Sequence, residues 1–231
     1  MYDVAVVMPV YNEAECIGAV ITSWLDQLGC MGLSFIIIVL NDGSRDGTAD
    51  ALAAYADTPE VRIVNKENSG HGPTILQGYA AAVQEALWVF QVDSDNEMEA
   101  CYFEDIWNAR QGCDAVIGLR DGRRQAPARK IVSAVSRLTV SILYGSGIRD
   151  VNCPFRLFRS PELEPLLHRI PADTFAPNVA LSGLFVLYKK AVRNIPVPHA
   201  DRTTGDVSIK KWKLLRAAVR SCLQTVVIRF G

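Results

Sequence analysis

The chain has 231 residues, and 49% of them are hydrophobic and 21% charged. This composition provides enough apolar side chains for a sizeable core, and it excludes an intrinsically disordered or collagen-like chain. The length fits one compact domain better than two small ones.

The net charge of -1 conceals an uneven distribution of charge along the chain. Residues 1–118 contain 4 Lys or Arg and 18 Asp or Glu, whereas residues 119–231 contain 20 Lys or Arg and 7 Asp or Glu. This asymmetry indicates either an anionic partner for the second half or attraction between two oppositely charged halves of the fold.

The first half alternates short β-branched runs with longer segments of helical periodicity. We expect strands at Val4–Met8, Phe35–Leu40, Val61–Val64, Leu87–Val92 and Ala115–Leu119. We expect helices at Glu13–Leu28, Asp46–Ala56, Thr74–Ala86 and Glu99–Arg110. This alternation predicts an α/β fold, with parallel strands, right-handed crossovers and helices on both faces of the sheet.

The second half is less regular than the first. Its spacing predicts a helix over Arg129–Tyr144, a strand over Pro154–Arg159 and a helix over Val179–Lys190. A polar turn follows Val197-Pro198-His199, and a final helix begins at about Ser208.

Polar, acidic or Gly-bearing segments follow four successive predicted strands, at residues 9–13, 41–48, 66–73 and 93–97. Ligands of open α/β sheets bind beyond the carboxyl ends of the strands, so these segments are candidates for a binding site. Asp93-Ser94-Asp95 can share a divalent cation with phosphate oxygens, and Glu97 adds a third carboxylate. The alternative is an acidic turn that caps the next helix.

The two middle segments also have ordinary interpretations, as turns that lead into helices. Asp42 is placed to accept hydrogen bonds from a ribose or base, and Asn68–Pro73 offers backbone N–H groups for an anion near a helix start. Within that segment, His71 is typical of a structural loop histidine rather than a base.

Four motifs in order resemble family 2 glycosyltransferases with the GT-A fold. They are Val7–Glu13, the loop Asn41–Thr48, Asp93-Ser94-Asp95 and the later Arg-rich segment. Within that family the chain is similar to the polyprenyl-phosphate sugar synthases, of which dolichyl-phosphate mannose synthase is one. The resemblance spans about Val4–Trp212 and implies a mostly parallel sheet flanked by helices, with a C-terminal amphipathic helix.

The resemblance also implies roles for individual residues. The nucleotide-sugar site would be formed by Pro9, Tyr11, Glu13, Asp42, Asp93, Ser94, Arg202 and Lys210. The metal ligands for Mg²⁺ or Mn²⁺ would be Asp93, Asp95 and Glu97. The acceptor phosphate would bind Arg124, Arg129 and Arg137, and the catalytic positions would be Asp95, Asp150 and Arg120.

The chain departs from the family pattern at three places. Asn41 stands where an Asp is common, and Glu97 where Gln is common. The loop that holds Arg202 has additional spacing between Ser208 and Lys210.

The last segment has two interpretations. Apolar pairs recur every four residues from Leu214-Leu215 to Val226-Val227, and Lys210-Lys211-Trp212-Lys213 precedes them. This pattern favours a basic amphipathic helix over residues 208–231 on an anionic membrane surface, attached to a glycosyltransferase domain over residues 1–207. An ordinary helix packed on the core is the alternative.

The six cysteines have no metal-binding spacing, and several lie within apolar stretches, which is typical of buried thiols in a reducing compartment. The N-terminal residues lack the basic region of a signal peptide, and the longest apolar run, Phe35–Leu40, is too short to cross a bilayer. We therefore expect a cytoplasmic protein, peripheral on the inner face of the membrane.

The resulting hypothesis is a metal-dependent inverting transfer of a sugar from a nucleotide-sugar donor to a polyprenyl phosphate, without a nucleic-acid partner. Two alternatives remain: the same fold acting on a glycan hydroxyl, and a catalytically inactive nucleotide-sugar-binding protein. A nucleotidyltransferase is disfavoured, since no Gly-rich nucleotide loop with Arg or Lys lies near the start of the chain.

Overall fold

The computed structural model describes residues 1–121, 127–199 and 211–231, and side chains of residues 127–132 and 211–218 are not described. The strands are β1 (Tyr2–Val10), β2 (Phe35–Asp42), β3 (Val61–Lys66), β4 (Ala86–Gln91), β5 (Ala115–Asp121), β6 (Arg156–Arg159) and β7 (Val192–Pro198). The α-helices are α1 (Ile17–Cys30), α2 (Thr48–Ala53), α3 (His71–Ala82), α4 (Phe103–Asn108), α5 (Pro127–Leu143), α6 (Ser160–Leu167), α7 (Pro177–Leu187) and α8 (Lys211–Phe230). A short 3-10 helix, Ala100–Tyr102, precedes α4.

The strands form one mixed sheet in the order β3-β2-β1-β4-β6-β5-β7. The expected α/β fold with a mostly parallel sheet is confirmed, since β1 to β4 are mutually parallel and β5 is parallel to β7. Strand β6 differs: it lies between β4 and β5 and is antiparallel to both. It therefore separates two strands that simple alternation would have placed side by side.

Two elements were missing from the sequence-based prediction. Helix α6 follows β6 directly, and Pro161 lies in its first turn, where proline is tolerated because the first amide groups have no helical partner. Strand β7 contains Pro196 and Pro198, which cannot donate to a sheet ladder. It lies at the edge of the sheet, where only its β5-facing side needs hydrogen bonds.

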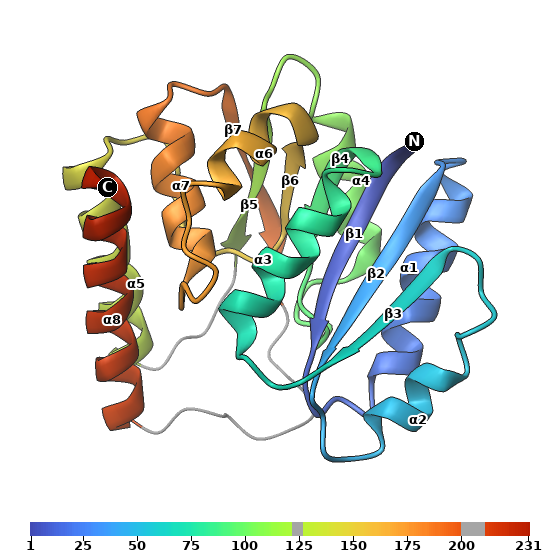
Figure 1. Cartoon of the computed structure of the whole chain (residues 1–231). Helices are drawn as coiled ribbons and strands as arrows, with labels where there is room; N and C mark the ends of the chain where they lie inside the picture. The colour runs from blue at the N-terminus through green and yellow to red at the C-terminus, as the bar shows by residue number, and fades with distance from the viewer. Residues whose placement is uncertain (122–126, 200–210) are drawn as a thin grey trace.

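The core lies on both faces of the sheet (Figure 1). Strands β1 and β2 are almost completely buried, as expected for central parallel strands covered on two sides. On one face, Trp24 of α1 packs against Phe90 and Phe103. On the other, Tyr79 of α3 packs edge-on against Phe158, which also contacts Phe185 of α7.

A buried arginine joins β6 to two neighbouring segments. Arg156 is fully inaccessible to solvent, and its guanidinium donates hydrogen bonds to the backbone oxygens of Val151, Cys153 and Asn178 and to Ser182 Oγ, at 2.7–3.4 Å. Burial lowers the pKa of Arg156, and these oxygens compensate the cost of desolvating its charge. The residue thereby ties the loop before β6 to the start of α7.

We predict that Arg156→Met lowers the free energy of unfolding by about 3 kcal/mol or more, since it removes four buried hydrogen bonds, among them the one from Arg156 Nε to Cys153 O. Urea denaturation followed by circular dichroism measures this change. Arg159→Met on the same strand is the matched control, because Arg159 is exposed, and its effect should stay within about 0.5 kcal/mol. Equal effects of the two substitutions would contradict the stabilising role assigned to Arg156.

Candidate functional site

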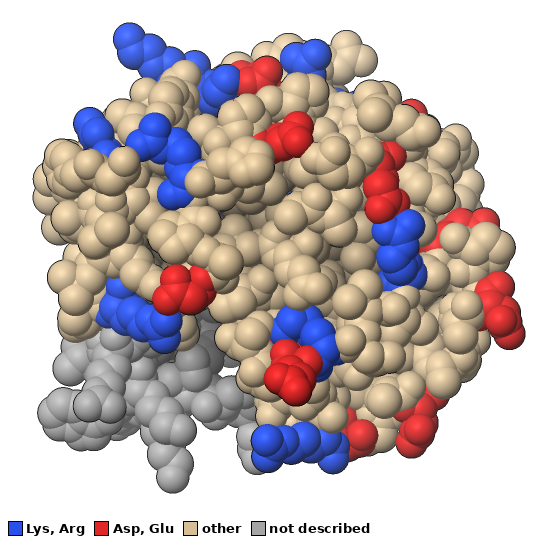
Figure 2. Space-filling view, in the orientation of Figure 1, with Lys and Arg blue, Asp and Glu red and all other residues tan. Residues whose placement is uncertain are grey.

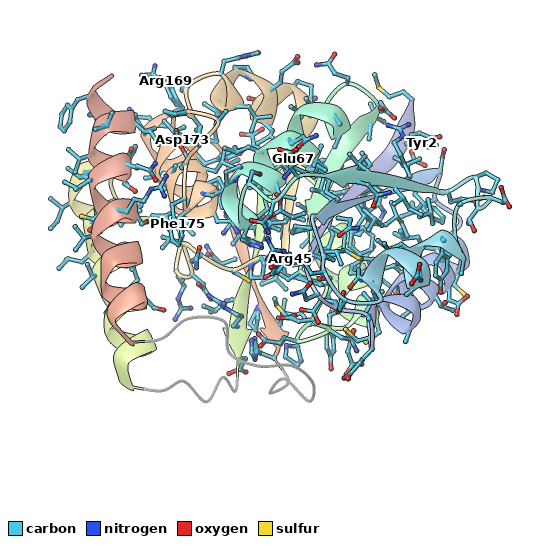
Figure 3. All side chains as sticks on the ribbon, turned by 60° about the horizontal axis from the view of Figure 1, so that its bottom comes forward. Tyr2, Arg45, Glu67, Arg169, Asp173 and Phe175 are labelled. Atoms are coloured by element: carbon cyan, nitrogen blue, oxygen red, sulfur yellow. The ribbon has the colours of Figure 1, made fainter. Side chains whose placement is uncertain are left out.

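The loops that follow β1, β2, β3 and β4 meet at one edge of the sheet, because the four strands are parallel and in register. The ends of β5 and β7 reach the same edge, where Asp121 pairs with Pro198. Figure 3 turns this edge toward the viewer, with Arg45 near its centre. The candidate site is built on these loops.

The first two loops are joined by hydrogen bonds. Asn12 adopts a left-handed backbone conformation, accepts a hydrogen bond from the Arg45 amide at 2.8 Å and donates its own amide to Ser44 Oγ at 3.0 Å. The Glu13 amide donates to Thr48 Oγ1 at 2.9 Å. These contacts place the expected nucleoside residues at the edge: Pro9 is buried in β1, whereas Tyr11 is 43% exposed.

The Asp42 carboxylate already accepts hydrogen bonds from other groups of the protein. Its carboxylate is nearly buried and accepts hydrogen bonds from Lys66 Nζ, the Ser69 amide at 2.8 Å and the Gly70 amide at 2.9 Å. Burial alone would raise the pKa of Asp42, but the hydrogen bonds, led by that from Lys66, hold it below its ordinary value. Asp42 therefore fixes the loop after β3, and its contact with a nucleoside stays a prediction.

Lys66 is a residue that sequence reasoning left without a role. Its ammonium group also donates to Glu67 O and Ser69 Oγ, each at 2.7 Å, and is 3.3 Å from Thr74 Oγ1. Lys66 is the last residue of β3 and pairs in register with Asp42 at the end of β2, and its place at this edge was the signal that could have identified it.

In the acidic segment after β4, the Asp93 carboxylate has a raised pKa. Burial raises the pKa of Asp93 to about 6, and the neighbouring charges of Asp95 and Glu97 add to this effect. His71 and Arg120 oppose it, and His71 Nε2 lies 3.6 Å from Asp93 Oδ1. The same Asp93 oxygen is inaccessible to solvent and has no hydrogen-bond partner.

Glu97 contacts a histidine that sequence reasoning missed. His199 Nε2 lies 2.9 Å from Glu97 Oε2, and the His199 side chain is 4% exposed. His199 follows β7 directly, and because β7 was not predicted, nothing indicated that this histidine would reach the acidic segment. Asp95 Oδ1 accepts a hydrogen bond from the Glu97 amide at 3.2 Å, which shapes the turn between them.

The carboxylates of Asp93, Asp95 and Glu97 are not placed to hold a metal ion together as a set of three. Within residues 1–121, 133–199 and 219–231, no three His, Cys, Asp or Glu side chains are placed to hold a metal ion together. Mg²⁺ is commonly held by one or two carboxylates together with water and substrate phosphate oxygens, so a pair of carboxylates is enough for a site of that kind. The three-residue ligand set stays a prediction.

Arg120 and Asp150 form a bidentate ion pair beside the acidic segment. The Arg120 Nε and Nη2 atoms donate to the two Asp150 oxygens at 2.7 and 2.9 Å, and both side chains are largely buried. Burial alone would raise the pKa of Asp150, but these bonds hold it below its ordinary value. A carboxylate with both oxygens paired in this way is a poor general base at neutral pH.

A cavity of about 230 Å³ lies next to this ion pair. It separates the end of β5 from α5 and is lined by Leu119, Arg120, Ser133, Ala134, Arg137, Arg149, Asp150, Val151 and Asn152. Arg137 was predicted from the sequence as an acceptor-phosphate residue, whereas Arg149 was not given a role. Three arginines against one aspartate give the cavity a net positive charge, which suits an anionic group.

The remaining predicted residues have no described side chains. Arg124, Arg202 and Lys210 lie outside the described residues, and Arg129 lies in α5 within the part whose side chains are not described. Ser94 is buried after β4, and its backbone oxygen lies 3.6 Å from Cys16 Sγ.

The family model for glycosyl transferase family 2 matches residues 5–162, more than half of the chain and all four loops of the site edge. The chain belongs to this family. It is therefore a glycosyltransferase, as the resemblance of its motifs indicated.

Two similar proteins are named for the transfer of a sugar to a lipid phosphate. The undecaprenyl-phosphate 4-deoxy-4-formamido-L-arabinose transferases of Salmonella typhimurium strain LT2 and Salmonella paratyphi B are each 26% identical to this glycosyltransferase over 98% of its chain and 69% of their own. Their name describes transfer of a sugar to a polyprenyl phosphate, the acceptor class of the branch that the motifs resemble.

Solved structures confirm the fold. Glucosyl-3-phosphoglycerate synthase of Mycobacterium tuberculosis, in complex with Mn²⁺, UDP and phosphoglyceric acid, matches 100% of this chain and 79% of its own with a TM-score of 0.68 at 18% identity. A second complex of that enzyme, with Mn²⁺, UDP-glucose and glycerol 3-phosphate, matches with a TM-score of 0.66 at 17% identity. At this identity the likeness establishes the GT-A fold of this glycosyltransferase.

We predict that Asp93→Asn stabilises the metal-free protein increasingly as the pH rises from 4 to about 6.5. The folded pKa of about 6 exceeds the ordinary value of 3.8, so in the unmodified protein ionisation opposes folding across this interval. The difference in free energy of unfolding should grow by about 1–2 kcal/mol, measured by urea denaturation in EDTA. Ser94→Ala, a buried neighbour that does not titrate, should show no such trend, and a flat difference for Asp93→Asn would refute the prediction.

Proposed function

We propose that this glycosyltransferase transfers a sugar from a nucleotide-sugar donor to a polyprenyl phosphate, with a divalent cation, at the cytoplasmic surface of a membrane. The observation that carries the proposal is that an acidic region and a basic region lie next to each other. The acidic end of β4 lies within electrostatic reach of Arg120, and Arg120 also lines the arginine-bearing cavity. A cation-assisted donor and a phosphate-bearing acceptor fit these two neighbouring places.

The donor half fits a divalent cation on the chemistry of its residues. Asp93 presents a buried oxygen without a hydrogen-bond partner, and its pKa is raised by burial and by Asp95 and Glu97. A cation bound by Asp93 and Asp95 would relieve both the missing contact and the mutual repulsion. When bound, such a cation supplies positive charge that stabilises the nucleoside diphosphate leaving group.

The acceptor half fits a phosphate. Arg137 and Arg149 line the cavity, and Arg120, which also lines it, is fixed by Asp150 through its Nε and Nη2 atoms. Arginine binds phosphate oxygens in a planar, bidentate geometry. The Asp150 carboxylate balances part of this positive charge and keeps Arg120 in place.

A phosphate acceptor also agrees with the pairing of Asp150 to Arg120. Its oxygen is anionic at neutral pH and attacks the anomeric carbon without prior loss of a proton. Asp150, the candidate base, is paired at both oxygens, which would be a poor arrangement for deprotonating a glycan hydroxyl. Attack from the acceptor cavity opposite the leaving diphosphate forms the new glycosidic bond with inversion at the anomeric carbon.

The cysteines and the acceptor named for the relatives support the proposed location. All six cysteines are free thiols, which agrees with a reducing compartment, but the expectation that they are buried is wrong, since only Cys153 is buried and Cys30 and Cys101 are exposed. Separately, no helix in the described part of the chain is long and apolar enough to cross a membrane. The lipid acceptor named for the Salmonella relatives supports a membrane surface as the place of reaction.

We expect the purified protein to form a lipid-linked product from at least one member of a panel of labelled sugar nucleotides, with polyprenyl phosphate and Mg²⁺ or Mn²⁺. EDTA should abolish the reaction, and Asp95→Asn should lower kcat by about 100-fold or more. Asp57→Asn on the exposed turn before β3 is the control and should leave kcat unchanged. Label found only in soluble glycan would favour the hydroxyl acceptor, and no product with any donor would favour an inactive binding protein.

We expect Arg137→Gln and Arg149→Gln each to raise the KM for the lipid phosphate by about tenfold to hundredfold, with the KM for the nucleotide sugar unchanged. Each substitution removes a charge-assisted hydrogen bond to the acceptor, worth about 1.5–3 kcal/mol. Steady-state kinetics with each substrate varied in turn measures the two constants. Arg169→Gln, which removes an exposed arginine between α6 and α7, is the control, and an increase in the donor KM instead would contradict the assignment.

A further inference from the structure

The chain between α6 and α7 lies between helix α8 and the loops of the candidate donor site. We call its residues 171–176 the 171–176 segment. Figure 3 labels two of them, Asp173 and Phe175, on the side of α8 that faces Glu67 and Arg45. Helix α7, which follows the segment, packs against both α3 and α8. The segment is therefore placed to connect α8 with the donor side of the molecule.

One side of the 171–176 segment is held by the side-chain amide of Gln224 on α8. Gln224 Oε1 accepts a hydrogen bond from the Phe175 amide at 2.8 Å, and Gln224 Nε2 donates to Asp173 O at 3.4 Å. The side chain thus pairs with the backbone of the segment as a neighbouring parallel strand would. The bond to the Phe175 amide is the shorter of the two, and we expect it to provide most of the effect.

A charged pair lies beside this amide contact. Arg220 Nη2 lies 3.7 Å from Asp173 Oδ2 and donates to Asp173 O at 3.3 Å, and the Arg220 guanidinium carbon lies 5.9 Å from the centre of the Phe175 ring. Helix α8 contains five Lys or Arg and no Asp or Glu, and acidic side chains gather mainly on the side of β2 and β3 in Figure 2. Both side chains of the pair are more than half exposed, so solvent screens their attraction. Gln224 is therefore the more specific of the two contacts.

The other side of the 171–176 segment packs against the first turn of α3. Gly72 in this turn is buried. A Cβ atom added at Gly72 would overlap Thr174 O and lie 2.6 Å from Phe175 O, so glycine is required for this close approach of the two backbones. The segment is thus fixed between Gln224 on one side and the start of α3 on the other.

The residues next to Gly72 make contacts of the candidate donor site. The Gly70 amide donates to the Asp42 carboxylate at 2.9 Å. His71 Nε2 lies 3.6 Å from Asp93 Oδ1. Because Gly72 directly follows these two residues, a shift of the segment against which it packs would move them relative to Asp42 and Asp93.

We propose that Gln224 is a positioning residue for binding of the donor. It holds the 171–176 segment against Gly72. The packing of Gly72 in turn keeps its neighbours in contact with Asp42 and Asp93. This inference rests on the proposed function for the identity of the ligand, a nucleotide sugar. It gives α8 a part in the geometry of the donor site, through the segment between them.

The first measurement requires no substrate. The Cε1–H resonance of His71 in an NMR spectrum reports the surroundings of this side chain, and it is assigned by its loss in His71→Gln, since the chain has three histidines. We expect Gln224→Ala to shift the His71 resonance at constant pH. Gln84→Ala is the matched control and should not shift it, because Gln84 is exposed and its amide joins Glu164, after the opposite end of α3, at 2.6 Å.

The second measurement is steady-state kinetics with each substrate varied in turn. We expect Gln224→Ala to raise the KM for the nucleotide sugar about fivefold to tenfold, the effect of losing one hydrogen bond, with the KM for the lipid phosphate unchanged. Gln224→Glu retains an oxygen for the Phe175 amide, so its donor KM and its His71 resonance should stay close to those of the unmodified protein. Equal increases in both KM values would indicate a general loosening of the fold and would overturn the inference.

Gly72→Ala tests the same contact from the other side. Its methyl group must displace the 171–176 segment, so it should raise the donor KM, and together with Gln224→Ala the increase should be smaller than the product of the two separate increases. The Gln224 variants alter a half-buried side chain and suffice for the test if Gly72→Ala does not fold.

Two results would overturn the inference: an unchanged His71 resonance in Gln224→Ala, or an unchanged donor KM of that variant in an active enzyme. Failure of the proposed function is a separate outcome. If the unmodified protein formed no product with any donor, the proposed function would be wrong, and the His71 resonance would decide whether Gln224 positions the start of α3.

Discussion

A single buried guanidinium holds together the half of the fold that faces the acceptor cavity. Arg156 joins the 151–153 loop to α7 through buried hydrogen bonds to the backbone oxygens of Val151, Cys153 and Asn178. Asp150 directly precedes that loop and fixes Arg120, and Arg120 acts electrostatically on Asp93. The relative position of the cavity and the acidic segment therefore depends on a charge in the core.

The uneven charge of the sequence acquires a structural meaning from this arrangement. The acidic first half ends its strands at an edge where carboxylates are crowded enough to raise the pKa of Asp93. The basic second half provides the arginines of the cavity and the charged residues of α5 and α8. The two halves meet at Arg120, which acts electrostatically on Asp93 and also lines the arginine-bearing cavity.

The first half of the fold was predictable because each of its signals is local. The β-branched runs of β1 to β5 and the polar residues after them identified the strands and the edge where the site lies. The antiparallel placement of β6 depends on tertiary pairing, which no local pattern encodes. Prolines in β7 concealed that strand, and with it the approach of His199 to Glu97. Lys66 was identifiable as an edge residue, but its ion pair with Asp42 was not, because the two residues lie 24 positions apart in the sequence.

The hydrogen bonds between the first two loops have a consequence for the energetics of donor binding. Asn12, Ser44 and Arg45 hold each other in place through backbone and side-chain contacts that require no ligand. Conformational entropy that folding has already removed from these loops is not lost again when a nucleotide enters. Under the proposed function, this preorganisation would let more of the interaction energy with the nucleoside appear as affinity. Loss of the Ser44 hydroxyl would remove one of these contacts and with it part of the preorganisation.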